Sequence, residues 1–216
     1  MKEDCDAMVE IDEPVLPRRL DHQALYNNGV SRIEYKSGRW VHIASPGGPR
    51  TGRAPDRTTL VVAISGDCLR NHATGRASVG VFWGYGNLNN VSTALDSYPG
   101  PRTRIMSELS ACCRALRDGL RIRQERPSCT PVQRLVVKSD SERVVSGITE
   151  YMPHWITNGW RTNNGGDVPY AGFYLEIGEL IAQLENEGTA VDFWFVSRRL
   201  NPDARRMARN GLRRDP

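Results

Sequence analysis

Three acidic side chains stand at the ends of elements that the sequence predicts. Asp67 closely follows the apolar run Leu60–Ile64, and Asp140 directly follows a second apolar run. Glu108 lies near the start of a helical apolar pattern. In sheets flanked by helices, chemistry is found where strands end and the chain turns. Carboxylates gathered there favour a hard cation such as Mg²⁺, which takes oxygen ligands. The three residues are therefore candidate metal ligands and catalytic groups.

Each of these acids also has a purely structural interpretation. Glu108 would complement the dipole at the N-terminus of its helix. Asp140 would cap the helix that follows it, and Asp67 would be a turn residue. Taken singly, the structural interpretations are favoured. The joint arrangement at three element ends makes the metal interpretation competitive.

The elements that must position these side chains follow from hydrophobic patterning. Short apolar runs predict strands, and apolar residues at helical spacing predict amphipathic helices. The predicted strands are Leu60–Ile64, Ala77–Trp83, Asn90–Leu95, Leu135–Ser139 and Val191–Val196. The predicted helices are Ser107–Arg121, a segment after Ser141 through Ile148, Phe173–Leu184 and Asn201–Leu212. Three strands followed by strand–helix alternation imply an α/β fold, with a five-stranded mixed sheet flanked by helices.

Length and composition indicate one domain of ordinary size plus an extension, in a chain of 216 residues. No apolar run approaches the roughly 18 residues that span a bilayer, and the acidic start lacks a secretory pattern. The five cysteines form no C-x-x-C pair, which favours reduced thiols in an intracellular protein, cytoplasmic or nuclear. The Arg-rich stretch 198–214 suits phosphate binding, although composition alone favours a solvated helix face.

Residues 1–57 differ in pattern from the rest and are expected to form an N-terminal extension to a domain at 58–216. Residues 1–14 are charged and poor in large apolar side chains, so we expect disorder there. Residues 32–43 alternate around a Gly-containing turn and predict a short hairpin. Residues 45–55 are rich in Pro and Gly, which is typical of a linker.

Six segments in residues 58–212 carry a recognisable series of motifs. They are V-V-A-I-S-G-D-C-L-R-N-H (61–72), R-A-S-V-G-V-F-W-G (76–84), I-M-S-E-L-S-A-C-C-R-A-L (105–116), K-S-D-S-E-R-V-V-S-G (138–147), W-I-T-N-G-W (155–160) and V-S-R-R-L-N-P-D-A-R-R-M-A (196–208). In this order and spacing they resemble ribonuclease H type 1, especially the form common in fungal genomes. The resemblance implies a ribonuclease H-like fold for residues 58–216 and leaves residues 1–57 outside it.

The resemblance also implies a metal-dependent hydrolase site. In the family, four carboxylates hold two divalent ions, Mg²⁺ or Mn²⁺, which assist cleavage of the RNA strand of an RNA–DNA hybrid. Glu108 and Asp140 match the second and third carboxylates, whereas the first falls on Ser65 and the fourth on Arg205. Two of the four ligands are thus replaced, one by a neutral hydroxyl and one by a permanent cation.

Arg205 is the more consequential of the two replacements. At about 4 Å and an effective dielectric of about 20, its charge would repel a divalent ion by roughly 8 kcal/mol, which weighs against a second metal. Arg205 could instead pair with Glu108 or Asp140, or contact a phosphate of bound nucleic acid. Asp67 could serve as a substitute ligand, because on an extended strand it shares a face with Ser65.

The resemblance further implies a protein surface that binds nucleic acid. Such a surface would recognise the nucleic acid mainly by its backbone shape and its RNA 2′-hydroxyls. Arg70 and Asn71 fall where family members contact the RNA strand. Trp160 and Arg161 fall in the region that often contacts the DNA strand, although Trp160 could equally be a packing residue. Tyr170 occupies a position where the family usually has Asn, which weakens the match to the hybrid-binding surface.

Three functions fit this sequence. The first is a ribonuclease H-like protein that binds an RNA–DNA hybrid or structured RNA with weak or no hydrolysis, and it need not hold a metal ion. The second is an active metal-dependent hybrid endoribonuclease that uses Asp67, Glu108 and Asp140. The third is a protein-interaction module that reuses the fold, since a fold alone does not decide function. Ser65 and Arg205 favour the first, and no membrane partner is expected.

Overall fold

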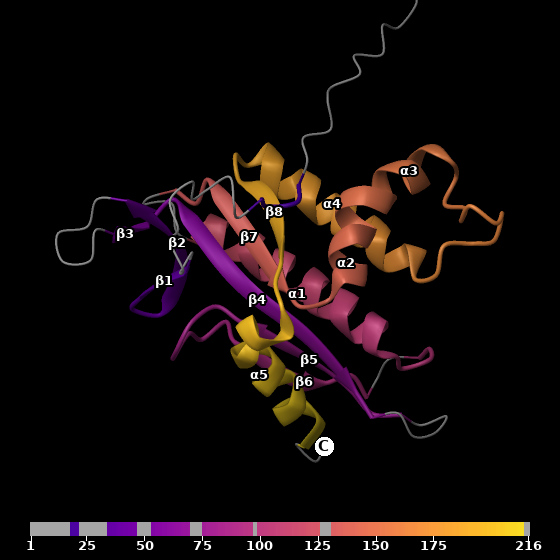
Figure 1. The fold of residues 1–216 in the computed structure, drawn as a ribbon, viewed down its shortest axis with the longest axis horizontal. Helices are drawn as coiled ribbons and strands as arrows, with labels where there is room; N and C mark the ends of the chain where they lie inside the picture. Colours follow the sequence, from indigo (N-terminus) through magenta and orange to yellow (C-terminus); the bar gives the residue numbers. More distant parts are fainter. Residues whose placement is uncertain are drawn as a thin grey trace, which may run out of the picture.

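A five-stranded mixed sheet forms the centre of the molecule (Figure 1). The computed structural model of the chain describes residues 18–21, 34–46, 53–69, 75–96, 99–125 and 131–213. The strands are β4 (Thr59–Cys68), β5 (Ala77–Phe82), β6 (Val91–Ala94), β7 (Arg134–Ser139) and β8 (Ala190–Phe195), in the order β6-β5-β4-β7-β8. Pairing is antiparallel from β6 to β4 and parallel from β4 to β8. The predicted fold class is confirmed.

Helices cover both faces of this sheet, unequally (Figure 1). One face carries α1 (Arg104–Glu125), α4 (Ala171–Asn186), the short α2 (Glu142–Ser146) and α3 (Met152–Thr157), with a π-helical turn at Gly147–Tyr151 between the last two. The other face carries α5 (Pro202–Arg213), preceded by a 3-10 turn at Arg198–Leu200. None of the helices in the described residues is both long and apolar enough to cross a membrane.

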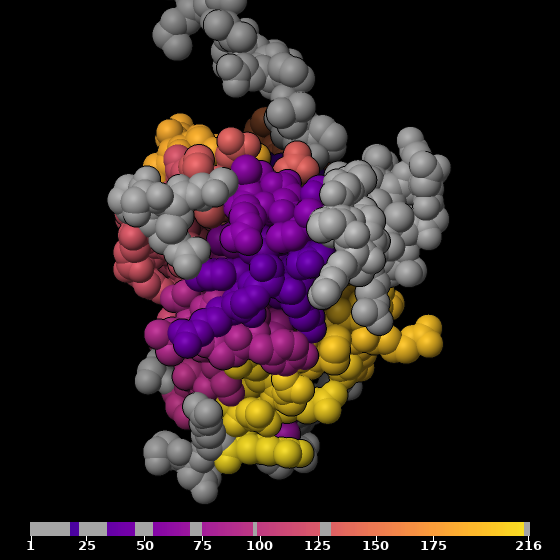
Figure 2. Space-filling model, turned by 90° about the vertical axis from the view of Figure 1, so that its left-hand side faces the viewer, coloured from indigo at the N-terminus to yellow at the C-terminus, as the bar shows by residue number. Residues whose placement is uncertain are grey.

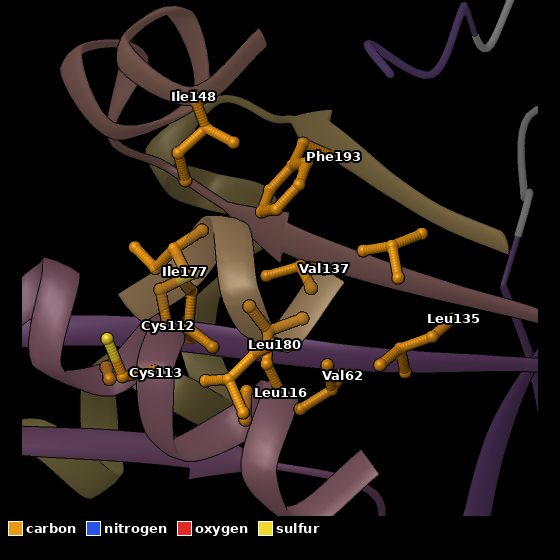
Figure 3. Close-up of a cluster of buried hydrophobic side chains, with 14 of the residues drawn as sticks. Val62, Cys112, Cys113, Leu116, Leu135, Val137, Ile148, Ile177, Leu180 and Phe193 are labelled. Atoms are coloured by element: carbon orange, nitrogen blue, oxygen red, sulfur yellow. The ribbon is translucent and has the colours of Figure 1, made fainter. Parts of the chain in front are cut away.

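The larger core lies between α1, α4 and the sheet (Figure 3). Leu116 of α1 and Ile177 of α4 are fully buried. They pack against Val62 of β4, Val137 of β7 and Phe193 of the edge strand β8. These strands read as continuous apolar runs because both of their faces are covered. Each such side chain contributes about 1.5–3 kcal/mol relative to an exposed one, so this core fixes the strand ends that carry the acidic residues.

A smaller core lies on the other face, and the N-terminal region contributes to it. The strands β1 (Glu34–Ser37), β2 (Trp40–Pro46) and β3 (Arg53–Asp56) form a separate antiparallel sheet. Val41 and Ile43 of β2 pack with Val61, Trp194 and their neighbours on the face that α5 leaves open. Figure 2 shows these indigo strands beside the yellow C-terminal segment.

Two local expectations differ from the structure. The linker expected over residues 45–55 is wrong at both of its ends, because residues 45–46 belong to β2 and residues 53–55 to β3, and the two strands pair. Proline is tolerated there since β3 is an edge strand. The first predicted strand does not stop before Gly66 but continues to Cys68, because β5 keeps pairing with it. The disorder expected for residues 1–14 lies outside the described residues.

Residues 18–20 extend the main sheet beyond its β8 edge. Arg19 forms a parallel bridge with Phe193, and the backbone N–H groups of Leu20 and Phe193 donate to Phe193 O and Arg18 O at 2.8 and 2.7 Å. Arg19 also forms ion pairs with Glu142 and Glu150 beside α2. The N-terminal region therefore covers an edge that would otherwise present unpaired backbone groups.

Candidate active site

Asp140 occupies the position directly after β7, at the C-terminal end of that strand. Because β4 and β7 are parallel and Ile64 pairs with Ser139, Asp140 lies level with Ser65. Its side chain is 4% exposed. Its Oδ1 accepts a hydrogen bond from Asn201 Nδ2 at 2.6 Å, whereas Oδ2 is buried and has no hydrogen-bond partner.

Glu108 approaches the same place from α1. Gly66 permits this approach, because a Cβ atom there would overlap the backbone of Ser107 and Glu108. Glu108 Oε1 accepts a hydrogen bond from Arg104 Nε at 2.8 Å, and Oε2 accepts one from Ser141 Oγ at 2.6 Å. Ser141 directly follows Asp140, so the two predicted carboxylates belong to one connected cluster.

Two guanidinium groups flank the free oxygen of Asp140. Arg104 Nη2 lies 3.9 Å and Arg205 Nε lies 3.8 Å from Oδ2, which are ion-pair distances but too long for hydrogen bonds. The hydrogen bond to Glu108 raises the pKa of Arg104, with the charges of Asp140 and Asp67 acting in the same direction. Burial lowers the pKa of Arg205, with repulsion from other arginines adding to it and Asp140 opposing it.

Ser65 and Asp67 lie on the same face of β4. Their direct partners on β5 are Gly80 and Ser78, and Ser78 Oγ donates to the Ala208 carbonyl of α5. Ser65 is buried, and Asp67 is half-buried with Oδ1 accepting from Cys68 N at 3.0 Å. Asp67 also lines a cavity of about 640 Å³ together with the arginines Arg102, Arg104 and Arg143.

The sequence of residues 57–195 matches the family model for RNase H. The chain belongs to the RNase H family. Ribonuclease H1 of Rattus norvegicus is 31% identical over 158 residues, which are 72% of this chain and 50% of that relative. Ribonuclease H1 of Homo sapiens is 29% identical over 157 residues, 71% of this chain and 50% of the relative. This RNase H-family chain thus spans about half the length of these curated relatives.

Solved structures of RNase H domains share the fold. The solution structure of the PFV RNase H domain is similar with a TM-score of 0.52 and 19% identity, covering 71% of this chain and 93% of that domain. The foamy viral protease-reverse transcriptase in complex with RNA/DNA hybrid gives the same TM-score at 15% identity, covering 70% of this chain and 20% of that one.

The metal ions expected for an RNase H site can be tested against these contacts. The buried, unpaired Oδ2 of Asp140 is a suitable ligand atom. However, guanidinium groups already lie on two sides of it, and Ser65 offers only a neutral oxygen. Within the described residues, no group of three or more His, Cys, Asp or Glu side chains is placed to hold a metal ion. These side chains do not fit a two-metal centre.

The structural interpretations of the three acids do not account for their positions. Ser141, not Asp140, is the N-cap of α2. The first turn of α1 contains no acidic residue, so Glu108 lies beyond the stretch where the helix dipole acts strongly. Asp67 lies within a strand rather than a turn. Glu108 and Asp140 are brought together as the sequence suggested, with Asp67 nearby at the side of Arg104.

The predicted nucleic-acid residues are spread more widely. Trp160 is half-buried after α3, with its ring centroid 6.4 Å from that of Trp155, and Arg161 is exposed and paired with Asp167 at 2.8 Å. In the described part of the chain, no contact joins either residue to Glu108 or Asp140. Two further candidates, at positions 70 and 71, lie outside the described residues, and the fifth, Arg205, lies beside Asp140.

Sequence reasoning missed three residues that hold the site. Arg104 precedes Glu108 by four residues, a spacing that predicts an ion pair on a helix. Ser141 and Asn201 both lie within the motifs that carry the family resemblance. Both are uncharged, so the sequence did not indicate them as site residues. Asn201 is 1% exposed, and its amide also donates to Ile64 O at 2.9 Å.

Proposed function

We propose that this RNase H-family chain binds RNA–DNA hybrids or structured RNA and hydrolyses them weakly or not at all. The observation that carries this proposal is the pair of guanidinium groups beside Asp140 Oδ2, the atom best suited to hold a metal. Two-metal hydrolysis depends on carboxylates that concentrate cations around the scissile phosphate. Here Arg104 and Arg205 supply positive charge at that place, which repels a divalent ion.

The same positive charge supports binding. Three arginines line the cavity beside Asp67, and guanidinium groups bind phosphate oxygens through paired, charge-assisted hydrogen bonds. A hybrid is recognised largely through its backbone and shape, so binding does not require an intact metal centre. One part of the solved foamy viral protease-reverse transcriptase in complex with RNA/DNA hybrid, 20% of that chain, has the same fold, which supports a hybrid as the ligand to test.

The test is incubation with a labelled RNA–DNA hybrid in Mg²⁺ and, separately, in Mn²⁺. We expect binding that weakens steeply as salt rises, without cleavage above that of a protein-free control. Cleavage that disappears in Asp140→Asn would contradict the proposal, because that variant separates this chain's activity from a contaminating nuclease. Neither binding nor cleavage would also contradict it and would leave a protein-interaction role.

A second candidate is an active hybrid endoribonuclease with a rearranged site. It is favoured by Asp140 Oδ2, which is buried without a hydrogen-bond partner, and by Asp67, whose charge acts on Arg104 at the edge of the same cluster. In this arrangement Asp67, Glu108 and Asp140 would hold Mg²⁺ or Mn²⁺ once Arg104 moved aside. Loss of Mn²⁺-dependent cleavage in Asp67→Asn would be its signature.

A further inference from the structure

Three arginines gather where α5 meets the 3-10 turn that precedes it. We name Arg198, Arg205 and Arg209 the arginine cluster. Arg205 and Arg209 are four residues apart on α5, so they are neighbours on one helix face. Arg205 Nη1 lies 3.4 Å from the Arg198 carbonyl oxygen, which brings the turn to the same face. Arg198 and Arg209 are exposed, and Arg205 is half-buried.

Within the part of the chain that the structure describes, the only carboxylate at ion-pair distance from Arg205 of the arginine cluster is that of Asp140. Asp140 is the carboxylate nearest Arg205, and it stays 3.8 Å away without a hydrogen bond. Burial and the charges of Arg198 and Arg209 lower the pKa of Arg205, and the attraction of Asp140 only opposes this. The next residue, Arg206, differs, because its Nη2 donates to Asp203 Oδ1 at 2.9 Å.

We propose that a backbone phosphate of bound nucleic acid binds the arginine cluster at Arg205 without a bridging metal ion. This rests on the proposed function and deepens it, since it assigns the place and the chemistry of one phosphate contact. A guanidinium group presents a planar fork of donors that matches phosphate oxygens. The exposed Arg198 and Arg209 would neutralise the remaining negative charge of the phosphate, so divalent ions are not needed at this contact.

The direction in which one substitution changes the affinity for nucleic acid distinguishes this arrangement from a metal site. Asp140 lies within ion-pair distance of Arg205, so its negative charge competes with an incoming phosphate. Asp140→Asn therefore raises affinity for nucleic acid in the absence of divalent ions. At a metal site the same substitution removes a ligand and lowers any affinity that depends on Mg²⁺.

The experiment measures fluorescence anisotropy of a labelled RNA–DNA hybrid with the full chain, in EDTA and in Mg²⁺. We expect the affinity of the unaltered protein to be no higher in Mg²⁺ than in EDTA, because Mg²⁺ competes for the phosphates and bridges no contact here. Arg205→Ala should weaken binding about tenfold in EDTA and reduce the salt slope by about 1. The matched control is Arg206→Ala, which removes the same charge from the same helix and should change affinity less than about twofold.

A second variant keeps the test independent of folding. Arg209 is exposed, and Arg209→Ala should fold normally and weaken binding about threefold. The inference is overturned if Arg205→Ala and Arg209→Ala bind like Arg206→Ala, or if Asp140→Asn weakens metal-free binding. In that case hybrid binding by the unaltered chain would still support the proposed function. Absence of all hybrid binding would instead overturn both.

Discussion

At the scale of single residues, the site depends on how Asp140 is held. Asn201 donates from one amide nitrogen to Asp140 Oδ1 and to Ile64 O, and so joins the start of α5 to the middle of β4 and the end of β7. The bond to Ile64 O is buried and the bond to Asp140 Oδ1 is partly buried, and removing the donor from a buried acceptor costs the desolvation free energy of that acceptor. Asn201 is therefore a positioning residue for the carboxylate.

Replacing Asn201 should lower stability clearly. Asn201→Ala removes the amide that donates to Ile64 O and Asp140 Oδ1, and we expect a loss of about 2–4 kcal/mol in the free energy of unfolding. Denaturant unfolding measures this loss. Asn210→Ala, at an exposed position on α5, is the matched control and should stay within about 0.5 kcal/mol. Equal stability of the two variants would show that the amide of Asn201 does not hold the site.

Restoring the missing carboxylates tests the role of the two replacements. The double variant Ser65→Asp with Arg205→Asp should bind Mn²⁺, which would raise its melting temperature and give metal-dependent cleavage of a hybrid. The neutral double variant Ser65→Asn with Arg205→Asn has similar shape and should show neither effect. If Mn²⁺ raises the melting temperature of the unaltered chain as much, the charge of Arg205 does not exclude the metal.

At the scale of elements, two glycines let helices approach the sheet closely. Gly66 of β4 lies against the start of α1, and Gly80 of β5 lies against α5. At Gly80 an added Cβ would overlap the backbone of Ala204 and Ala208, which cannot move as a side-chain end can. These two contacts place Glu108 and Arg205 at opposite sides of Asp140.

Gly80→Ala should therefore disturb both stability and the site. We expect a loss of about 1–3 kcal/mol in the free energy of unfolding, since α5 must shift to relieve the overlap. Gly172→Ala is the control, because nothing lies near its added Cβ in α4 and helical Ala is favoured by about 0.5–1 kcal/mol. Thermal unfolding compares the two, and a Gly80→Ala melting point at or above that of the unaltered chain would contradict the close contact.

Much at this scale could be predicted from the sequence, and the exceptions have a common cause. Apolar runs located four strands of the main sheet, β4, β5, β7 and β8, because their burial leaves a local pattern. The short edge strand β6 was expected over Asn90–Leu95, although only Val91 in it is buried. Gly66 suggested a strand end, whereas its role is contact with α1, which no local pattern records. Asp140 and Glu108 were placed together by the strand-end rule. Arg104 lies between them because its side chain reaches Asp140, which is 36 positions later in the chain, and no local pattern records such a contact.

At the scale of the whole molecule, the N-terminal region completes the fold around the site. α5 covers only part of its face of the main sheet, and β2 covers more of it with Val41 and Ile43. Lys138, buried on β7, forms an ion pair with Glu34 of β1 and donates to Leu200 O at 3.0 Å. Lys138 thus links the N-terminal strands to the turn that carries Arg198 of the arginine cluster.

This arrangement predicts that the N-terminal strands and the main sheet unfold together. Ile43→Ala should lower the free energy of unfolding by about 2–4 kcal/mol, because it leaves a cavity in the smaller core. Leu88→Ala, at a side chain that is 90% exposed, is the control and should change it by less than about 0.5 kcal/mol. Tryptophan fluorescence and circular dichroism should report one shared transition, shifted in Ile43→Ala. Two separate transitions, with only the first shifted, would instead make the N-terminal sheet an independent unit that does not support α5 or the residues it brings to Asp140.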